Sequence, residues 1–132
     1  MSQENVDTVR RAYERVTADL ETPRELLHPE YEVDARDVSP EGAWPRGYDA
    51  SEEVLREYWG TFEDFRVEIE EVIHADDEQV VDVARDGGRV KGSDAEVWNR
   101  FFHVWTFRDG KIVRLSIHTD RNRALKAAGL SE

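Results

Sequence analysis

The run from Glu96 to Leu130 constrains the fold more than any other part of the chain. It contains two segments of alternating apolar and polar residues, separated by Asp109-Gly110. An Asp-Gly pair between such segments is the strongest short-range sign of a β-hairpin, because both turn residues must tolerate a positive φ. We therefore predict two long antiparallel strands joined by a two-residue turn and followed by a short helix.

The register of this hairpin decides which side chains share a face. If Arg108 pairs with Lys111 and pairing continues one residue at a time, opposed side chains lie about 5 Å apart. The first face then carries Asn99, Phe101, His103, Trp105, Phe107, Ile112, Arg114, Ser116, His118 and Asp120. A core would not accept so many polar groups, so we expect this face to line a pocket. A one-residue bulge would invert the assignment.

The second face of the hairpin is more uniformly apolar. It carries Trp98, Arg100, Phe102, Val104, Thr106, Val113, Leu115, Ile117 and Thr119. We expect it to pack either against another layer of the same chain or against a dimer partner.

The rest of the chain supplies helices first and strands later. Helical spacing of apolar residues predicts a helix over 5–20, and Pro23 suits the start of a short helix over 23–27. Alternation predicts a strand over 31–35, and an Asp-x-x-Glu capping box at Asp49 and Glu52 opens a helix over 49–62. Strands follow over 65–73 and 79–85, with a polar loop over 87–94 before the hairpin.

This order predicts an α+β fold in which 1–132 form a single domain. Helices gathered on one side of an antiparallel sheet are typical of that class. A strongly curved sheet wrapped around the N-terminal helices would be cone-shaped and would leave an internal pocket.

Composition excludes some functions. The chain has a formal net charge of −12 and no cysteine. Such an acidic surface disfavours nucleic-acid and membrane-surface binding, and the absence of thiols rules out cysteine nucleophiles and cysteine-ligated metals. No apolar stretch is long enough to span a bilayer. We expect a cytoplasmic protein with no metal and no cofactor.

Several stretches resemble the nuclear transport factor 2-like superfamily, in its SnoaL-like and ketosteroid-isomerase-like branch. They cover almost the whole chain and read VRRAYERV, ELLHPEYEV, RGYDASEEVLREYW, FHVWTFRDGKIVRL and TDRNRALKAAGL. The resemblance implies a cone-shaped α+β barrel with a pocket between sheet and helices, and commonly a homodimer. It is specific for the fold and poorly specific for activity.

The resemblance also implies roles for single residues. His103 holds the position of the oxyanion-binding acid of ketosteroid isomerases, and Tyr13 holds that of their oxyanion-hole tyrosine. Their general-base aspartate falls at Ala35, so the steroid isomerase mechanism lacks its base. Asp34 is one residue away, which on a strand means the opposite face.

The epoxide hydrolases of the superfamily resemble this chain at Asp120, near the end of the last predicted strand. The epoxide hydrolases also need an Arg-x-Asp, but this chain reads Val80-Val81-Asp82 at that place. The SnoaL-type cyclases pair an aspartate base with a histidine, a pairing that Asp120 could imitate with His103 or His118.

Each candidate also has a structural alternative. His103 is either a pocket acid or base, or a core histidine bonded to Ser116 or Tyr13. Asp120 is either a base or the N-cap of the last helix.

Three functions remain open. The first is cofactor-free acid/base catalysis on an apolar cyclic or carbonyl-bearing molecule, with His103, Tyr13 and Asp120 as catalytic residues. The second is a non-catalytic domain that binds a small apolar ligand in the same pocket, and the third is a dimeric protein-interaction module. The expected ligand-binding residues are Trp59, Asn99, Phe101, Trp105, Arg114, Ser116 and His118.

Overall fold

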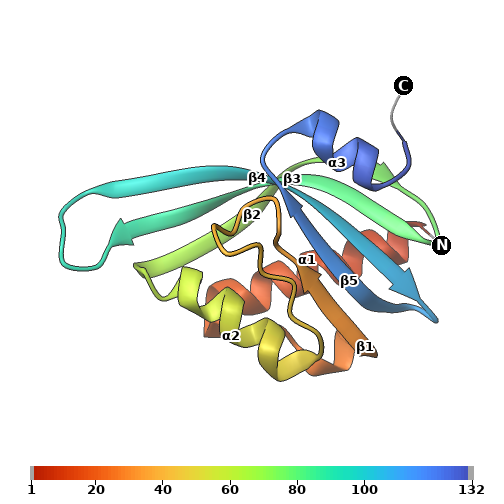
Figure 1. Ribbon diagram of the computed structural model, residues 1–132, viewed down its shortest axis with the longest axis horizontal. Coiled ribbons are helices and arrows are strands. Elements are labelled where there is room, and N and C mark those ends of the chain that lie inside the picture. Colours follow the sequence, from red (N-terminus) through yellow and green to blue (C-terminus); the bar gives the residue numbers. More distant parts are fainter. Residues whose placement is uncertain (1, 131–132) are drawn as a thin grey trace.

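Five strands form one curved, unclosed sheet in the order β1-β5-β4-β3-β2 (Figure 1). The computed structural model describes residues 2–130. The elements are α1 (Ser2–Asp19), the 3-10 helix η1 (Arg24–Leu26), β1 (Leu27–Asp34), α2 (Tyr48–Trp59), β2 (Phe62–Ala75), β3 (Gln79–Val90), β4 (Glu96–Arg108), β5 (Lys111–His118) and α3 (Arg121–Ala127). Strands β2 to β5 pair antiparallel, whereas β1 joins β5 in parallel.

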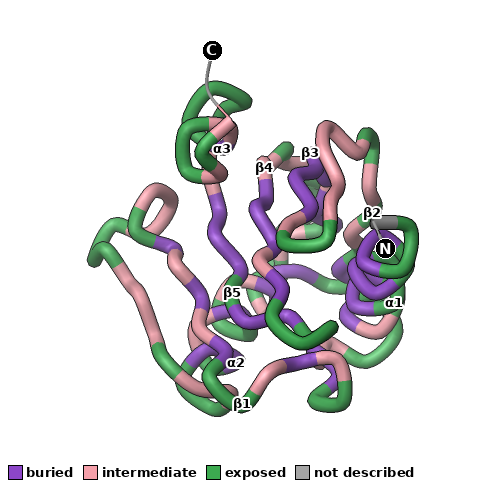
Figure 2. Tube along the Cα trace, turned by 90° about the vertical axis from the view of Figure 1, so that its right-hand side faces the viewer, coloured by how far each residue is buried: buried purple, intermediate pink, exposed green. Residues whose placement is uncertain are grey.

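Helices α1 and α2 lie on one side of the sheet, and α3 lies on the other (Figure 1). Helix α1 packs on β2 and β3, and α2 packs on β1 and β2. The main core lies between these helices and the sheet, where the buried segments face one another (Figure 2). The α+β class and the curved sheet around N-terminal helices are confirmed.

Helix α3 covers part of the opposite side of the sheet. Ala124 of α3 is fully buried against Val81 of β3 and Val104 of β4, with Phe102 packed beside them. This part of the second hairpin face is therefore covered by a layer of the same chain.

The expected turn is present, with φ of 54° at Asp109 and 76° at Gly110. Arg108 pairs with Lys111 and Phe107 with Ile112, as predicted. The predicted register beyond this point is wrong, because the pairing shifts by one residue and Thr106 lies opposite Arg114. The extra residue in β5 is a β-bulge, which reverses the faces of everything that follows it in this strand.

The physical reason for the bulge lies in the polarity of β5. With it, Leu115 and Ile117 enter the main core, while Arg114 stays exposed beside Glu32. Without it, a guanidinium would enter the core in place of a leucine, and burying an unpaired charge costs far more than a bulge.

The region 23–35 also differs from the prediction. The short helix is one 3-10 turn, and His28-Pro29 lies inside β1 rather than ending a helix. The pairing of β1 with β5 shifts between Leu27 and Glu32. Proline lacks an N–H group and is tolerated at such irregularities of an edge strand.

Helix α2 begins and ends earlier than expected, and Phe62 opens β2 instead of closing the helix. The predicted capping box is not formed. The N-cap residue is Gly47, which has no side chain to cap the helix, and the Asp49 carboxylate pairs with Arg24. Glu52 instead accepts a 2.9 Å bond from the backbone N–H of Thr22. The Glu52 carboxylate thus joins α2 to the segment that follows α1.

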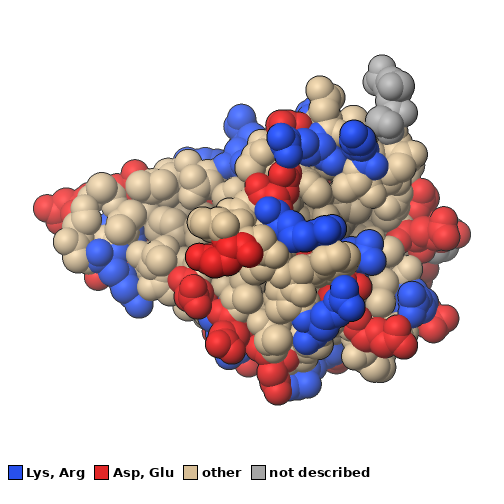
Figure 3. All heavy atoms as spheres, viewed as in Figure 1, with Lys and Arg blue, Asp and Glu red and all other residues tan. Residues whose placement is uncertain are grey.

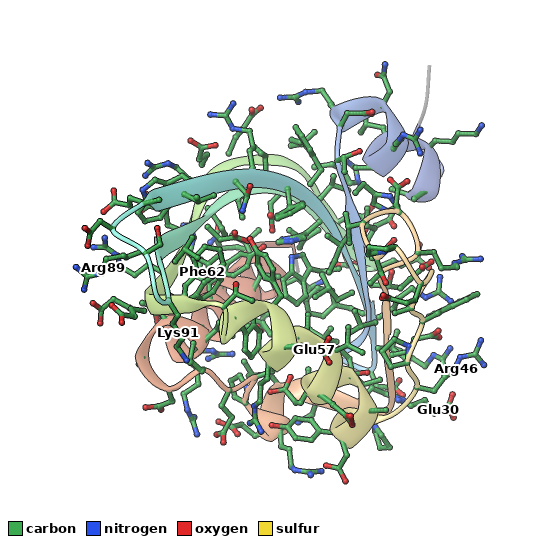
Figure 4. All side chains as sticks on the ribbon, turned by 60° about the vertical axis from the view of Figure 1, so that its left-hand side comes forward. Glu30, Arg46, Glu57, Phe62, Arg89 and Lys91 are labelled. Carbon is green, nitrogen blue, oxygen red and sulfur yellow. The ribbon has the colours of Figure 1, made fainter. Side chains whose placement is uncertain are left out.

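Gly87 and Gly88, predicted to begin a loop, lie inside β3, which runs on to Val90. Both have a positive φ, of 146° and 151°. A Cβ at Gly87 would lie 2.0 Å from the carbonyl oxygen of Val97 on β4. The glycines therefore let neighbouring strands approach closely and extend the β3–β4 arm. Arg89 and Lys91, labelled in Figure 4, lie toward the tip of this arm.

Acidic and basic side chains are interspersed over the face shown in Figure 3. Many of them form surface ion pairs, such as Arg100–Glu70 at 2.6 Å and Arg121–Glu71 at 3.0 Å. Within residues 2–130, no helix combines the length and apolar character needed to cross a membrane.

Candidate functional site

A cavity of about 670 Å³ lies between the concave side of the sheet and helices α1 and α2. Its wall is mainly apolar and aromatic, with polar groups at a few points. The wall includes Ala12, Tyr13, Val16, Tyr31, Ala35, Leu55, Tyr58, Trp59, Phe65, Val67, Asp86, Phe101, His103, Trp105, Leu115 and Ile117. An apolar cavity with a few polar groups is typical of a small-molecule site.

The exposed members of the wall mark the opening of the cavity. They are Pro40, Glu41, Glu57 on α2 (labelled in Figure 4), and Thr61. The segment 38–43 supplies several wall residues, but Trp44 does not contribute. The guanidinium groups of Arg36 and Arg46 stack on the ring of Trp44, with their Cζ atoms 3.9 and 4.8 Å from the ring centroid.

A buried hydrogen-bond network lies at the sheet side of the cavity. The hydroxyl of Tyr13 is 2.9 and 3.1 Å from the two carboxylate oxygens of Asp82 and 2.5 Å from Nδ1 of His103. The indole N–H of Trp105 donates to the same carboxylate at 2.9 Å. All four residues are at least 93 % buried, and Asp82 is fully enclosed.

Three elements hold this network in place. Tyr13 lies on the buried stripe of α1 with Val9 and Val16. Asp82 on β3 is the direct cross-strand partner of His103 on β4, and Val80 pairs with Trp105 in the same ladder. The alternation of the two strands therefore turns Asp82, His103 and Trp105 toward the helix together.

With Asp82 ionised, one assignment of protons satisfies every contact in the network. The Trp105 indole and the Tyr13 hydroxyl both donate to Asp82, and His103 Nδ1–H donates to the Tyr13 oxygen. Burial, followed by the nearby Asp82 charge, raises the pKa of Tyr13 well above its usual value. Tyr13 therefore stays protonated, and its single proton is engaged with Asp82.

The other ring nitrogen of His103 is left for the cavity. Among the described residues, no group bonds Nε2 of His103, and the imidazole forms part of the cavity wall. This atom can donate a proton to a bound molecule, or accept one from it, while Tyr13 and Asp82 hold the ring.

A second polar group lies further along the same wall. The Tyr58 hydroxyl donates to Asp86 Oδ1 at 2.6 Å, and Asn99 Nδ2 donates to the Tyr58 oxygen at 2.8 Å. Asp86 and Asn99 are cross-strand partners on β3 and β4, and Tyr58 reaches them from α2. Burial raises the pKa of Asp86, and the hydrogen bond from Tyr58 opposes this rise.

The structure brings only some of the expected site residues together. Tyr13, His103, Trp105, Phe101 and Trp59 all line the cavity. Asn99 reaches the site through Tyr58.

The expected residues of β5 lie on the other face, because of the bulge in that strand. Arg114 is exposed, with Glu32 3.5 Å away. Ser116 Oγ lies 2.6 Å from Nε2 of His118, and Nδ1 of His118 lies 3.2 Å from Asp37. This chain of contacts resembles a catalytic triad in its order, but neither Ser116 nor His118 lines the cavity. It ties β5 to the segment that follows β1.

Asp120 is the N-cap of α3. Its side chain accepts a 2.8 Å bond from the backbone N–H of Arg123, and the residue is exposed. The cap was the structural alternative for this residue, and the geometry matches it. Within the described residues, no group of three or more His, Asp or Glu side chains is arranged to hold a metal ion.

Ala35 lines the cavity, at the place where the family resemblance implies a general base. The neighbouring Asp34 does not replace it. Its carboxylate is held by Arg36 at 2.8 and 2.9 Å, and these bonds lower its pKa. The cavity therefore lacks a carboxylate at this position.

Sequence reasoning missed Asp82, Asp86 and Tyr58 as members of the site. A signal for the two aspartates was present, because alternation in Val80-Val81-Asp82-Val83-Ala84-Arg85-Asp86 places both on one face of a strand. For Asp86 this signal was concealed, because the predicted strand ended at residue 85 and a loop was expected from Gly87. Tyr58 carried no comparable signal, since a tyrosine on the apolar face of a helix is typical of a core.

Comparison with known proteins identifies the family. The model of the SnoaL-like domain matches residues 9–115. No curated protein sequence matches the chain.

Solved structures share the fold at low sequence identity. Bal32a, from a soil-derived mobile gene cassette, is 20 % identical with a TM-score of 0.75, covering 96 % of both chains. TerC, co-crystallised with polyporic acid, is 21 % identical with a TM-score of 0.70, covering 96 % of this chain and 97 % of TerC. An epoxide hydrolase of M. tuberculosis, described as LEH-like, is 20 % identical with a TM-score of 0.68, covering 98 % and 97 %. The family match spans most of this chain and the fold agrees with it: the protein belongs to the SnoaL-like family.

Proposed function

We propose that this protein is a cofactor-free enzyme that moves a proton on a small, mainly apolar, cyclic carbonyl compound bound in the cavity. The observation that carries the proposal is His103. Its Nδ1 is held by Tyr13, which is itself held by Asp82, while its Nε2 is left to the cavity. A histidine oriented by a buried carboxylate is a common arrangement for acid/base chemistry.

The wall of the cavity supports an apolar ring as the ligand. Trp105 and Phe101 line the cavity from β4, Trp59 from α2 and Phe65 from β2. Aromatic walls gain free energy by burying a planar apolar molecule. The few polar groups then fix its orientation.

In the proposed reaction, His103 is doubly protonated: its Nδ1–H donates to Tyr13, and its Nε2–H donates a hydrogen bond to the carbonyl oxygen of the substrate. The Asp82 carboxylate supports this imidazolium through Tyr13, and the imidazolium stabilises the negative charge that develops on the substrate oxygen. Tyr13, Asp82 and Trp105 are positioning residues. Because they are buried, the donor geometry is set before the substrate arrives.

The test is a thermal-shift screen of cyclic ketones and phenols, repeated with His103→Ala and with His74→Ala as the matched control. His74 pairs with Asp76 outside the cavity. We expect at least one compound to stabilise the wild-type protein and the His74 variant, and to lose most of its effect on the His103 variant. A screen without any stabilising compound would refute the proposal. A compound that binds and is never turned over would support a ligand-binding domain instead.

A further inference from the structure

Asp86 is the buried carboxylate of the cavity wall. The wall contains two other acidic residues, Glu41 and Glu57, but both are exposed. Asp82 is fully enclosed by its partners and does not line the cavity. Asp86 is 5 % exposed and does line it. Among these carboxylates, Asp86 alone combines burial with contact to the cavity.

The surroundings of Asp86 hold the carboxylate without neutralising it. None of the ion pairs among residues 2–130 includes Asp86, so no arginine or lysine compensates its charge. Its partner is the Tyr58 hydroxyl, which Asn99 holds from the other side. A purely structural buried carboxylate is normally paired with a cation, since an unpaired one costs stability. Here burial raises the pKa of Asp86, which makes it a stronger base than an exposed aspartate.

His103 and Asp86 face the cavity from neighbouring strands. His103 on β4 is opposite Asp82 on β3, and Asp86 is four residues further along β3. The Cα atoms of Asp82 and Asp86 are therefore about 13 Å apart along the strand. The pair between them is Ala84 and Phe101. Ala84 belongs to the main core, and Phe101 lines the cavity between His103 and Asp86. The cavity that both side chains line has a volume of about 670 Å³, which accommodates a ring-sized carbon skeleton with a hydrogen bond of about 3 Å at each end.

We propose that Asp86 is the general base of the reaction, with Tyr58 and Asn99 as its positioning residues. This inference rests on the proposed function and supplies the base that is missing at Ala35. The Asp86 carboxylate removes a proton from a carbon α to the substrate carbonyl, or from the vinylogous carbon. The electron pair of that C–H bond forms a C=C bond, and the π pair of the carbonyl moves onto the oxygen bonded by His103.

The protonated Asp86 then returns the proton to another carbon of the same enolate. The net change is an isomerisation that needs no co-reactant. The substrate class is therefore a cyclic ketone with an acidic C–H group on the side of the ring that faces Asp86.

The experiment uses a matched pair of small probes. 2-Tetralone is a cyclic ketone with acidic α protons, and 2-naphthol is planar and resembles its enol. Exchange of the α protons of 2-tetralone in D₂O is followed by NMR, and the affinity for 2-naphthol is measured by calorimetry. Both are measured for the wild type, Asp86→Asn, Tyr58→Phe, His103→Ala and the control Glu70→Gln. Glu70 is paired with Arg100 and does not line the cavity.

We expect Asp86→Asn to slow exchange by about 100-fold or more, the usual contribution of a general base. The same variant should bind 2-naphthol more tightly than the wild type, because a neutral side chain mimics the protonated base beside an enolate. Tyr58→Phe should slow exchange less and change its pH profile, and Glu70→Gln should change neither measurement.

Three outcomes would overturn the inference. Exchange of 2-tetralone by Asp86→Asn at nearly the wild-type rate would show that Asp86 is not the base. If His103→Ala still abolished exchange in that case, the proposed function would stand and only the role of Asp86 would fail. A parallel loss of exchange and of 2-naphthol affinity would show that Asp86 only maintains the fold. If the wild type neither bound 2-naphthol nor exchanged 2-tetralone, the proposed function itself would fail for this substrate class, and the inference with it.

Discussion

Replacement of Asp86 by asparagine should stabilise this protein at neutral pH. Asparagine keeps the shape of the side chain and can still accept the 2.6 Å bond from Tyr58. It removes a charge that is 5 % exposed and has no cationic side chain as its partner among residues 2–130. A residue that costs stability in this way is typical of a functional site.

The magnitude follows from two opposing terms. The effective penalty for burying an unpaired ion is several kcal/mol. A hydrogen bond to a charged group returns about 1.5–3 kcal/mol, whereas the amide–hydroxyl bond of the variant is worth about 1 kcal/mol. The partial access of Asp86 to the cavity reduces the penalty further. We expect a net gain of about 1–2 kcal/mol, or about 3–8 °C in the melting temperature of a domain of this size.

The gain should depend on pH in a defined direction. Because the pKa of Asp86 is raised on folding, the folded state binds its proton more tightly than the unfolded state. The wild type therefore carries no penalty below the pKa of the unfolded chain, near 3.9. Its stability falls as the pH rises from there to the raised folded value, and the full penalty persists above it. The advantage of Asp86→Asn should open across that interval and then stay constant.

Urea denaturation of both proteins between pH 4 and 8 measures this difference, provided that their m-values agree. Glu70→Gln is the control with the opposite sign, because hydrogen bonds from Arg100 lower the pKa of Glu70. That variant should gain no stability with rising pH. An Asp86→Asn protein less stable than the wild type at pH 7, or a difference independent of pH, would refute the reasoning.

Three further predictions concern other parts of the structure. Tyr13→Phe leaves Asp82 and His103 without their shared hydroxyl and should cost about 1–3 kcal/mol of stability by urea denaturation, with a weaker response to any cavity ligand. Gly87→Ala should lower the free energy of unfolding by about 2 kcal/mol or more, since the added Cβ would meet a β4 carbonyl. Gly92→Ala, with open space around it, should lower it by about 1 kcal/mol, both measured by urea denaturation. Asp120→Ala should lose about 1 kcal/mol of thermal stability through the N-cap and leave 2-naphthol affinity unchanged; a large loss of affinity would restore Asp120 to the site.

The sequence by itself determined the order of elements and the nature of the main turn. Asp109-Gly110 adopts positive φ at both residues because few other pairs do so without strain. The apolar stripe of α1 and the alternation in β3 and β4 are local patterns, and each indicates a buried face without reference to the rest of the chain. His103 and Tyr13 could be placed on such faces from the sequence and the family resemblance.

Tertiary structure alone decided which polar groups share the cavity. The bulge in β5 sends Arg114 and Ser116 outward and brings Leu115 and Ile117 inward, because the sheet gains more by burying leucine and isoleucine than by keeping an unbroken ladder. Strand β3 continues through Gly87, where a loop was expected. The backbone of Val97 on β4 approaches so closely there that only a residue without a side chain fits.

The same holds for the chemistry of the site. The oxygens of Asp82 meet Tyr13 across 69 positions of sequence, and Tyr58 meets Asp86 across 28. No local pattern contains such a contact, because it arises only when α1 and α2 pack on the concave side of the sheet. The sequence thus placed His103, which we propose as the acid, on a recognisable strand. The packing of the helices supplied its support and the carboxylate that we propose as the base.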